Sequence, residues 1–447
     1  MKKILLIILL ITISCSDKEI TYIGGKILKK TSDEISILKD EKLIKKIAIN
    51  ENGEFFSKLD SINDGLYNFI HLPEFQYLIF EKGDSIVLRL DVLDFDESLV
   101  FTGKGSSKNN YLIDVFLKHE EENDFIKSKF KSNDMNFIKT IDSLINIKII
   151  EFSKFKKFNK TNQSTELILE YAIKLPIYSN VEYFISNFSS SIKSSDIYKY
   201  REDVDLNLET FSHFKPYLDY IISRTINHSN QNVNTDSHNS LNYNLKRLEF
   251  VNRNITHPII KTKIYRYIGF EYLLKESELM NINTFLNKFL EYSNNTSTNK
   301  EINELYNNIF SLQVNNNIPQ VNLVNEKSVV KDIADFYNDK PIVYVFWSYD
   351  QNSHQIALFN RINKILNSNS NYNIHTININ DDNFKWKKII NLLKKRKNLH
   401  HFRSVEFDDM SKKMILNNLN KVIITNKNGK IKKILNVTEL EKLFNTN

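Results

Sequence analysis

The stretch VYVFWSYDQNSH, from Val343 to His354, decides the fold of the C-terminal part of the chain. The apolar and aromatic residues from Val343 to Trp347 are typical of a strand that is buried on both faces. A short polar loop follows the strand, and HQIALFNRINKILNS then has the apolar spacing of an amphipathic helix. A buried strand that leads through a short loop into a helix predicts an α/β unit with a central sheet.

The segments that follow continue this pattern. YNIHTINI predicts a strand and DNFKWKKIINLLKKRK a helix. NKVIITNKNGKIKKIL predicts a hairpin that turns at Asn428-Gly429. TELEKLF predicts a last helix with a capping box from Thr438 to Glu441. The order of strand, helix, strand, helix, hairpin and helix predicts an α/β domain over residues 313–447.

This order and its motifs resemble the thioredoxin fold, in particular membrane-anchored thiol-disulfide oxidoreductases of the TlpA/ResA type and their AhpC/TSA relatives. VYVFW resembles the first core strand of that family, and Ile318-Pro319 with Val321 to Val324 resembles its lead-in strand. VIITNKNGKI, residues 422–431, resembles the later strand and hairpin. The resemblance covers residues 313–447 and implies a thioredoxin-like domain.

The active-site positions of that family carry other residues here. The resemblance places the two cysteines of its Cys-x-x-Cys motif at Gln351 and His354, and its cis-proline at Asn420. The redox chemistry needs a thiolate at the helix N-terminus and a second thiol that resolves the mixed disulfide. An amide and an imidazole supply neither, and the peroxidatic variant of the fold also needs a thiolate. We therefore predict the fold without its redox activity, and no catalytic residue.

Cys15 is the only cysteine of the 447 residues. It follows Lys2-Lys3 and an apolar run from Ile4 to Ile13, which is shorter than the roughly 20 residues that span a bilayer. We therefore predict a signal peptide over residues 1–14. Ser14-Cys15 resembles the lipobox of bacterial lipoproteins, which implies a lipid on Cys15 and attachment to the outer membrane, at its periplasmic face or at the cell surface. The alternative is an ordinary signal peptide that contains a cysteine.

The rest of the chain predicts two further domains. Residues 15–105 show short runs of alternating apolar and polar residues, which predict a β-sandwich. Asn52-Gly53 between two such runs is a hairpin signal, and Gly83-Asp84 marks a second turn. Residues 106–312 have helical periodicity, with a predicted loop over 227–242.

Three motifs of the first part, NGEF, FEKGDSI and FTGKGSSKNNYL, resemble the β-sandwich domain that precedes thioredoxin-like domains in many lipoproteins of Gram-negative bacteria. The predicted fold class is therefore multidomain α+β: an N-terminal β-sandwich, a helical middle domain and a C-terminal thioredoxin-like α/β domain.

Charge and motifs exclude several function classes. The net charge is +7 with the basic residues spread along the chain, so we predict no nucleic-acid partner. The sequence has no Gly-x-Gly-x-x-Gly fingerprint, no phosphate loop and no Gly-x-Ser-x-Gly elbow. His400 and His401 are adjacent, and on a strand they would point to opposite faces. We predict neither a cofactor nor a metal ion.

Three functions remain open. The first is a binding or scaffold protein of the cell envelope, anchored to the membrane by its N-terminal lipid. It would bind an envelope protein or peptide in a groove lined by Trp347, Gln351, His354 and Asn420. The alternative is a thiol-disulfide oxidoreductase or peroxiredoxin-like enzyme, as the family resemblance implies. The third is a cysteine-independent enzyme that uses His354 as a base.

Overall fold

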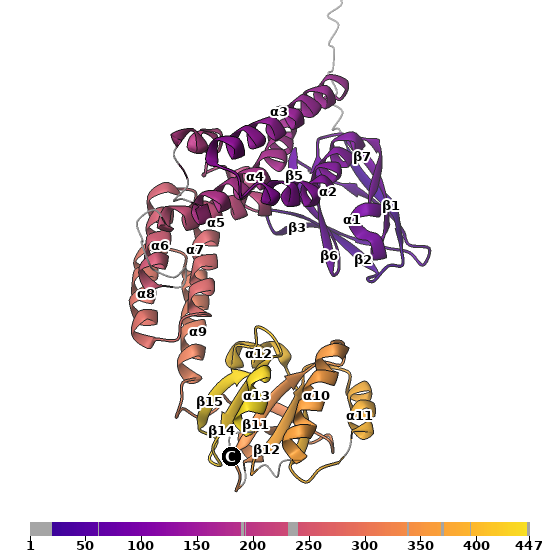
Figure 1. The fold of residues 1–447 in the computed structure, drawn as a ribbon. Coiled ribbons are helices and arrows are strands. Elements are labelled where there is room, and N and C mark those ends of the chain that lie inside the picture. The colour runs from indigo at the N-terminus through magenta and orange to yellow at the C-terminus, as the bar shows by residue number, and fades with distance from the viewer. Residues whose placement is uncertain are drawn as a thin grey trace, which may run out of the picture. The chain divides into compact units, whose positions relative to one another are not determined.

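The computed structural model describes residues 20–444, except residues 61, 189–191, 193, 231–239, 338, 368–370 and 394. The chain divides into two compact units, Met1–Ile268 and Gly269–Asn447 (Figure 1). The predicted signal peptide and Cys15 lie outside the described residues, and the predicted domain boundaries at 105 and 312 stay predictions. Within the described ranges, no helix combines the length and the apolar character that a membrane crossing requires.

The described residues of the first unit form two four-stranded sheets. One sheet has the strand order β4-β1-β7-β8 and the other has the order β3-β2-β5-β6. The strands are β1 (Thr21–Leu28), β2 (Glu34–Lys39), β3 (Lys42–Ala48), β4 (Glu54–Leu59), β5 (Gly65–His71), β6 (Glu74–Phe80), β7 (Ser85–Asp91) and β8 (Val100–Lys104). A short 3-10 turn, Val92–Asp94, and helix α1 (Phe95–Ser98) join β7 to β8.

The alternation of apolar and polar residues explains why each strand has one face in the core. In β7, Ile86, Leu88 and Leu90 are buried, while Val87 between them is exposed. The buried residues belong to one apolar cluster that also includes Phe69 of the second sheet. Because successive side chains of a strand point to opposite faces, the two inner faces close on each other and form the core of the sandwich.

The prediction of a hairpin at Asn52-Gly53 is wrong. The chain does turn there, with Gly53 in the left-handed region at φ 78°. However, β3 before the turn pairs with β2, and β4 after it pairs with β1 in the other sheet. The turn therefore carries the chain from one sheet to the other. Alternation and a turn dipeptide specify that two strands follow each other, but they do not specify which strands pair.

Helices follow the two sheets along the chain, and α2 and α4 lie against β6 and β5 of one sheet. The helical elements are α2 (Ser106–Ser128), α3 (Asp134–Phe158), α4 (Gln163–Phe188), η3 (Ser195–Asp203), the 3-10 turn η4 (Glu209–Phe211), α5 (Lys215–Asn230), α6 (Leu241–Asn254) and α7 (Pro258–Leu273), whose last residues belong to the second unit. Tyr77 of β6 packs its ring against Phe116 of α2 and against Phe214, and its hydroxyl accepts a hydrogen bond from the Lys215 amide at 2.9 Å. The outer face of the other sheet is bare by comparison, since Phe56 of β4 is 67% exposed.

Helix α4 contains a proline, and a side chain of α2 supplies the hydrogen bond that the proline removes. Pro176 has no N–H, so the carbonyl of Ala172, four residues earlier, lacks its helical donor. Nε2 of His119, on α2, lies 2.9 Å from that carbonyl and donates to it. The same imidazole lies 3.1 Å from the Glu122 carboxylate through Nδ1. The proline therefore ties α4 to α2 and does not leave a buried acceptor unpaired.

The predicted loop over 227–242 is partly wrong. Helix α5 continues to Asn230, and the side chain of Asn227 is buried against Glu182 of α4. Residues 231–239 lie outside the described residues, and α6 begins at Leu241 behind a Ser240 cap. The polar composition of NHSN predicts a loop, but the side chains of Asn227 and Asn230 hydrogen-bond to Glu182 and Ser186 of α4 at the interface between the two helices.

The second unit begins with two helices and continues as a mixed α/β sheet. The helices are α8 (Leu279–Tyr292) and α9 (Thr296–Ser311). The sheet has the strand order β10-β9-β13-β12-β11-β14-β15. Its elements are β9 (Asn322–Asn325), β10 (Val330–Asp332), η5 (Ile333–Phe336), β11 (Ile342–Trp347), α10 (Asn352–Asn367), β12 (Asn373–Asn378), α11 (Asn383–Leu392), β13 (Leu399–Ser404), α12 (Phe407–Met414), β14 (Lys421–Thr425), β15 (Ile431–Asn436) and α13 (Val437–Phe444).

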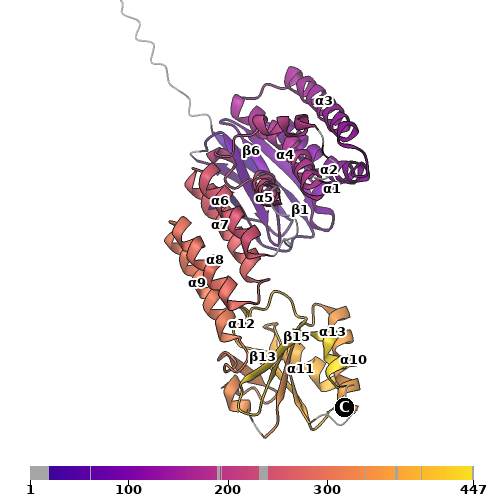
Figure 2. The ribbon, with the colours of Figure 1, turned by 60° about the vertical axis from the view of Figure 1, so that its left-hand side comes forward.

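Strand β11 lies at the centre of this sheet, and all six of its residues are buried. It pairs in parallel with β12 and antiparallel with β14. Trp347 and its neighbours on one face pack with apolar residues of α10, α11 and α13, while Phe346 on the other face packs with residues of α12 (Figure 2). This is the thioredoxin-like arrangement, and with the two-sheet and helical parts it confirms the predicted fold class.

The predicted capping box is displaced by two residues. The hairpin at Asn428-Gly429 is present, with β14 and β15 antiparallel. The helix that follows begins at Val437, and its cap is Asn436. The Asn436 side chain accepts from the Thr438 amide at 3.0 Å, and the Glu439 carboxylate accepts from the Asn436 amide at 2.9 Å. Asparagine caps helices as well as threonine does, and Asn436 precedes Thr438 by two residues, so the helix starts earlier than predicted.

Candidate functional site

The loop after β11 lies where the sequence analysis placed it. Gln351 immediately precedes α10, and its carbonyl accepts the first helical hydrogen bond from the Gln355 amide at 2.9 Å. His354 lies in the first turn of α10, and Asn420 immediately precedes β14. The positions that the family uses for its dithiol and its cis-proline therefore come together at one end of the sheet.

The loop is held by a polar network that the sequence analysis did not find. Asn380, which follows β12, accepts hydrogen bonds from the Ser348 hydroxyl at 2.9 Å and from the Tyr349 amide at 3.1 Å. Its own amide donates to the Asp350 carboxylate at 2.6 Å. Lys385 bonds the same carboxylate at 3.2 Å and lies 4.0 Å above the Tyr349 ring. These groups satisfy one another's hydrogen-bonding capacity, and together they hold the loop in one shape.

His354 is covered by the chain before β14. Both of its ring nitrogens are shielded from solvent, and neither makes a hydrogen bond of regular geometry to another described residue. Burial lowers the pKa of His354 from its ordinary value, while the nearby Leu419 backbone and Asn420 side chain raise it by less. The imidazole is therefore neutral at pH 7, and its nitrogens do not reach a solvent-borne substrate. This arrangement disfavours a role for His354 as a general base.

The other predicted groove residues differ in their exposure. Trp347 is fully buried and packs edge to face against Phe359, with the ring centroids 5.3 Å apart. Gln351 and Asn420 are exposed. Trp347 supports the end of the strand from inside, while Gln351 and Asn420 present amides at the surface. That these residues form a binding groove stays a prediction.

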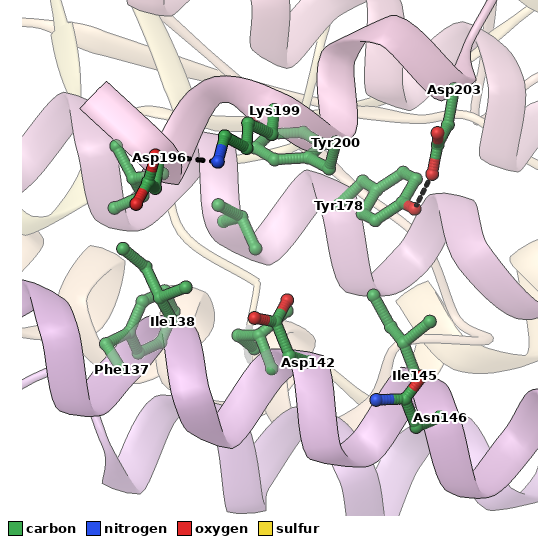
Figure 3. A pocket seen from close by; sticks show the side chains of 13 residues that line it. Phe137, Ile138, Asp142, Ile145, Asn146, Tyr178, Asp196, Lys199, Tyr200 and Asp203 are labelled. Carbon is green, nitrogen blue, oxygen red and sulfur yellow. Dashed lines mark hydrogen bonds and ion pairs between the residues drawn. The ribbon is translucent and has the colours of Figure 1, made fainter. Parts of the chain in front are cut away.

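The structure also contains a cavity that the sequence analysis missed. It has a volume of about 460 Å³ and lies between α3, α4 and η3 in the first unit (Figure 3). The residues that line it are Phe137, Ile138, Ile141, Asp142, Ile145, Asn146, Tyr178, Val181, Asp196, Ile197, Lys199, Tyr200 and Asp203. They stand at ordinary helical spacing in the sequence, so no local pattern distinguishes them from core residues.

A buried ion pair fixes one wall of this cavity. Glu182 of α4 has no exposed surface, and Arg201 of η3 binds it through two nitrogens, at 2.8 and 2.6 Å. Arg224 at 3.3 Å and the Asn227 amide at 2.6 Å, both from α5, bind the same carboxylate. The two hydrogen bonds between Arg201 and Glu182 hold η3 against α4, because separating them would leave the buried Glu182 carboxylate with fewer partners.

Comparison with known proteins gives a likeness of fold only. No family model matches the chain, and no curated protein matches it in sequence. Among solved structures, it is similar to the thioredoxin domain of a thiol-disulfide oxidoreductase from Bacteroides vulgatus, with 18% identity and a TM-score of 0.24, over 30% of this chain and 96% of that one. A domain of a possible thiol-disulfide isomerase from Cytophaga hutchinsonii gives 18% identity and a TM-score of 0.25, over 30% of this chain and 90% of that one.

A thiol peroxidase from Chromobacterium violaceum is similar at 14% identity and a TM-score of 0.26, over 30% of this chain and 86% of that one. About 30% of the chain thus resembles thioredoxin-like thiol-disulfide oxidoreductases and peroxiredoxins in structure. The sequence has a single cysteine, so it contains no cysteine pair with which to perform the chemistry that those names describe.

Proposed function

We propose that this protein is a lipoprotein of the cell envelope whose thioredoxin-like domain has lost redox activity and serves in binding or as a scaffold. The observation that carries the proposal is the loop after β11. Side chains of Ser348, Asp350 and Asn380 bond one another where the family holds a reactive dithiol. A polar, fixed loop beside exposed amides at Gln351 and Asn420 suits recognition of an extended peptide more than it suits electron transfer.

The competing function is that of a thiol-disulfide oxidoreductase or a peroxiredoxin-like enzyme. It would need a thiolate at the start of α10, where Gln351, Asn352, Ser353 and His354 stand. Detergent-solubilised full-length protein should reduce no insulin disulfides and consume no peroxide beyond a buffer control. Turnover in a sample shown to be free of contaminating oxidoreductase would reject the proposal.

The binding role is tested by photo-crosslinking in cells that produce the protein. A photoreactive amino acid replaces Gln351, and in a matched control it replaces Asn360, an exposed residue of the helix α10 that follows. We expect a crosslinked envelope protein or peptide from position 351 and none from position 360. We also expect His354→Ala combined with Asn420→Ala to weaken the crosslink. Equal crosslinking from both positions would mean that the loop is ordinary surface.

The anchor is tested separately, because the binding site and the lipid can fail independently. Acylation of Cys15 motivates the change Cys15→Ser, which should move the protein from the membrane fraction to the soluble fraction. Lipid attachment is strong because each buried methylene contributes about 0.8 kcal/mol. Retention of the variant on membranes after a high-salt wash would refute the lipoprotein assignment and leave the binding proposal standing.

A further inference from the structure

The cavity between α3 and η3 has apolar walls. The apolar lining residues include Ile138, Ile141 and Ile145 of α3, Val181 of α4 and Ile197 of η3. In Figure 3, Ile138 and Ile145 rise from α3 toward the space below η3. Its volume of about 460 Å³ lies within the range that small-molecule and side-chain sites occupy. Such walls favour an apolar body of moderate size.

Most of the charged groups around this space already have partners. Asp196 pairs with Lys199 at 2.9 Å. Asp203 accepts a hydrogen bond from the Tyr178 hydroxyl at 2.8 Å and lies 3.7 Å from the ammonium of Lys174. These contacts are intramolecular, so the groups that make them are satisfied before any ligand arrives.

Asp142 is different. Its carboxylate points from α3 into the space between Ile138 and Ile145 (Figure 3). It makes no hydrogen bond or ion pair with any residue that the structure describes. Asp142 is an exposed residue, yet partial burial of its carboxylate raises the pKa of Asp142, and the charge of Lys199 offsets this effect only in part. An ionised carboxylate on an apolar wall gains most from a cation that also fills the space beside it.

We propose that this cavity binds an amphipathic organic cation, which has an apolar body and one ammonium or guanidinium group that pairs with Asp142. The lining residues include three aspartates and one lysine, so an anion would meet net repulsion. A neutral apolar ligand would fill the space but leave the carboxylate unpaired. The two sources of this chemistry are a lysine or arginine side chain of a peptide and a free amine.

Contacts within the chain hold the walls of the cavity in place. Tyr178 and Tyr200 pack at the back of the cavity with ring centroids 4.7 Å apart. Arg201, next to Tyr200, is held by the buried carboxylate of Glu182. Binding therefore requires little ordering of the wall, which reduces its entropic cost. The cavity belongs to the first compact unit and the loop at 348–354 to the second, so failure of this inference does not affect the proposed function.

The test measures binding by calorimetry to the full-length protein in detergent. The probes for a free amine are 4-phenylbutylamine and its neutral counterpart 4-phenylbutanol. The probes for a peptide are acetyl-Phe-Lys-amide and acetyl-Phe-norleucine-amide, which keeps the methylene chain without the ammonium. We expect at least one cationic member to bind about threefold to fivefold more tightly than its neutral partner, as for a partly exposed ion pair. The pair that shows the preference identifies the source.

Variants assign the effect to the cavity. Asp142→Asn should reduce the preference for the cation to less than about twofold, whereas Asp124→Asn, at an exposed position of α2, should leave it unchanged. Ile145→Trp should fill the space and abolish binding of both members of each pair, while Ile147→Trp, at an exposed position of the same helix, should not. Equal affinities of cation and neutral probe, an undiminished preference in Asp142→Asn, or no binding of either cation would overturn the inference.

Discussion

The central sheet of the second unit should lose stability as the pH falls from 7.5 to 5, and His375 is one of the residues responsible. This residue of β12 is 1% exposed, and the rings of Tyr344 and Phe402 pack against it with centroids at 5.4 and 4.9 Å. Burial, with a smaller contribution from neighbouring His400, lowers the pKa of His375 from 6.5 to about 3. Buried His401 on β13 has a pKa of about 4 for the same reasons.

The direction follows from the proton balance. Because the folded-state pKa of His375 lies below its unfolded value of 6.5, the unfolded state binds more protons between pH 6.5 and 3. The stabilisation is therefore complete above pH 6.5 and is lost as the pH falls. At pH 5 the unfolded imidazole is almost fully protonated and the folded one is neutral, which costs about 2 kcal/mol. His401 adds about 2 kcal/mol for the same reason.

The assay is urea denaturation followed by tryptophan fluorescence. Trp347 and Trp386 are the two tryptophans of the chain, and both are fully buried in this sheet domain, so their emission reports its unfolding. His375→Phe replaces the imidazole by a ring that has no titratable group. The new ring would lie among the same aromatic neighbours. Between pH 7.5 and pH 5, the unfolding free energy of the variant should fall by about 2 kcal/mol less than that of the natural protein. If the variant and the natural protein lose equal stability over this range, the assignment to His375 is wrong.

Three further changes test other parts of the structure. Glu182→Ala should destabilise the helical part by about 3–5 kcal/mol, because it leaves the half-buried Arg201 and Arg224 without their shared carboxylate. Far-ultraviolet circular dichroism during heating measures the loss, and a cost below about 1 kcal/mol would contradict the importance of this pairing. Asn380→Ala should cost about 1–3 kcal/mol and speed amide hydrogen exchange at Tyr349, and unchanged exchange there would show that the loop does not depend on Asn380. Trp347→Ala should cost about 3–5 kcal/mol in urea denaturation followed through Trp386; a small loss would mean that the strand end tolerates a cavity.

The elements of regular period were predictable from the sequence. The alternation in β7 and the continuous apolar run of β11 identified strands of two different kinds, one with a single buried face and one with two. The hairpin at Asn428-Gly429 was found because its strands are neighbours in both sequence and space. β13 and α12 were not among the predicted elements, since LHHFRS mixes polar and apolar residues and FDDMSKKM is a helix of only two turns. The strands on either side of Asn52-Gly53 pair with other strands, β3 with β2 and β4 with β1. The sequence around the turn does not specify these partners.

The same distinction holds for the candidate site. The positions of Gln351 and His354 at the start of α10 could be predicted, because strand, loop and helix are consecutive. The role of Asn380 could not, since it reaches the loop from the end of another strand. The cavity beside Asp142 depends on how α3 packs against η3, and no spacing within either element encodes it.

The network around Asn380 has a consequence for how the protein responds to its surroundings. In a dithiol protein, oxidation adds a covalent bond and reduction adds an ionisable thiol, so loop geometry and ligand affinity are thermodynamically linked to the ambient reduction potential. Here the loop is held by hydrogen bonds among Ser348, Tyr349, Asp350 and Asn380, and none of these groups gains or loses electrons in that range. Under the proposed binding function, the affinity at this end of the sheet is independent of reducing agents and oxidants, and a partner is held equally in compartments of very different reduction potential.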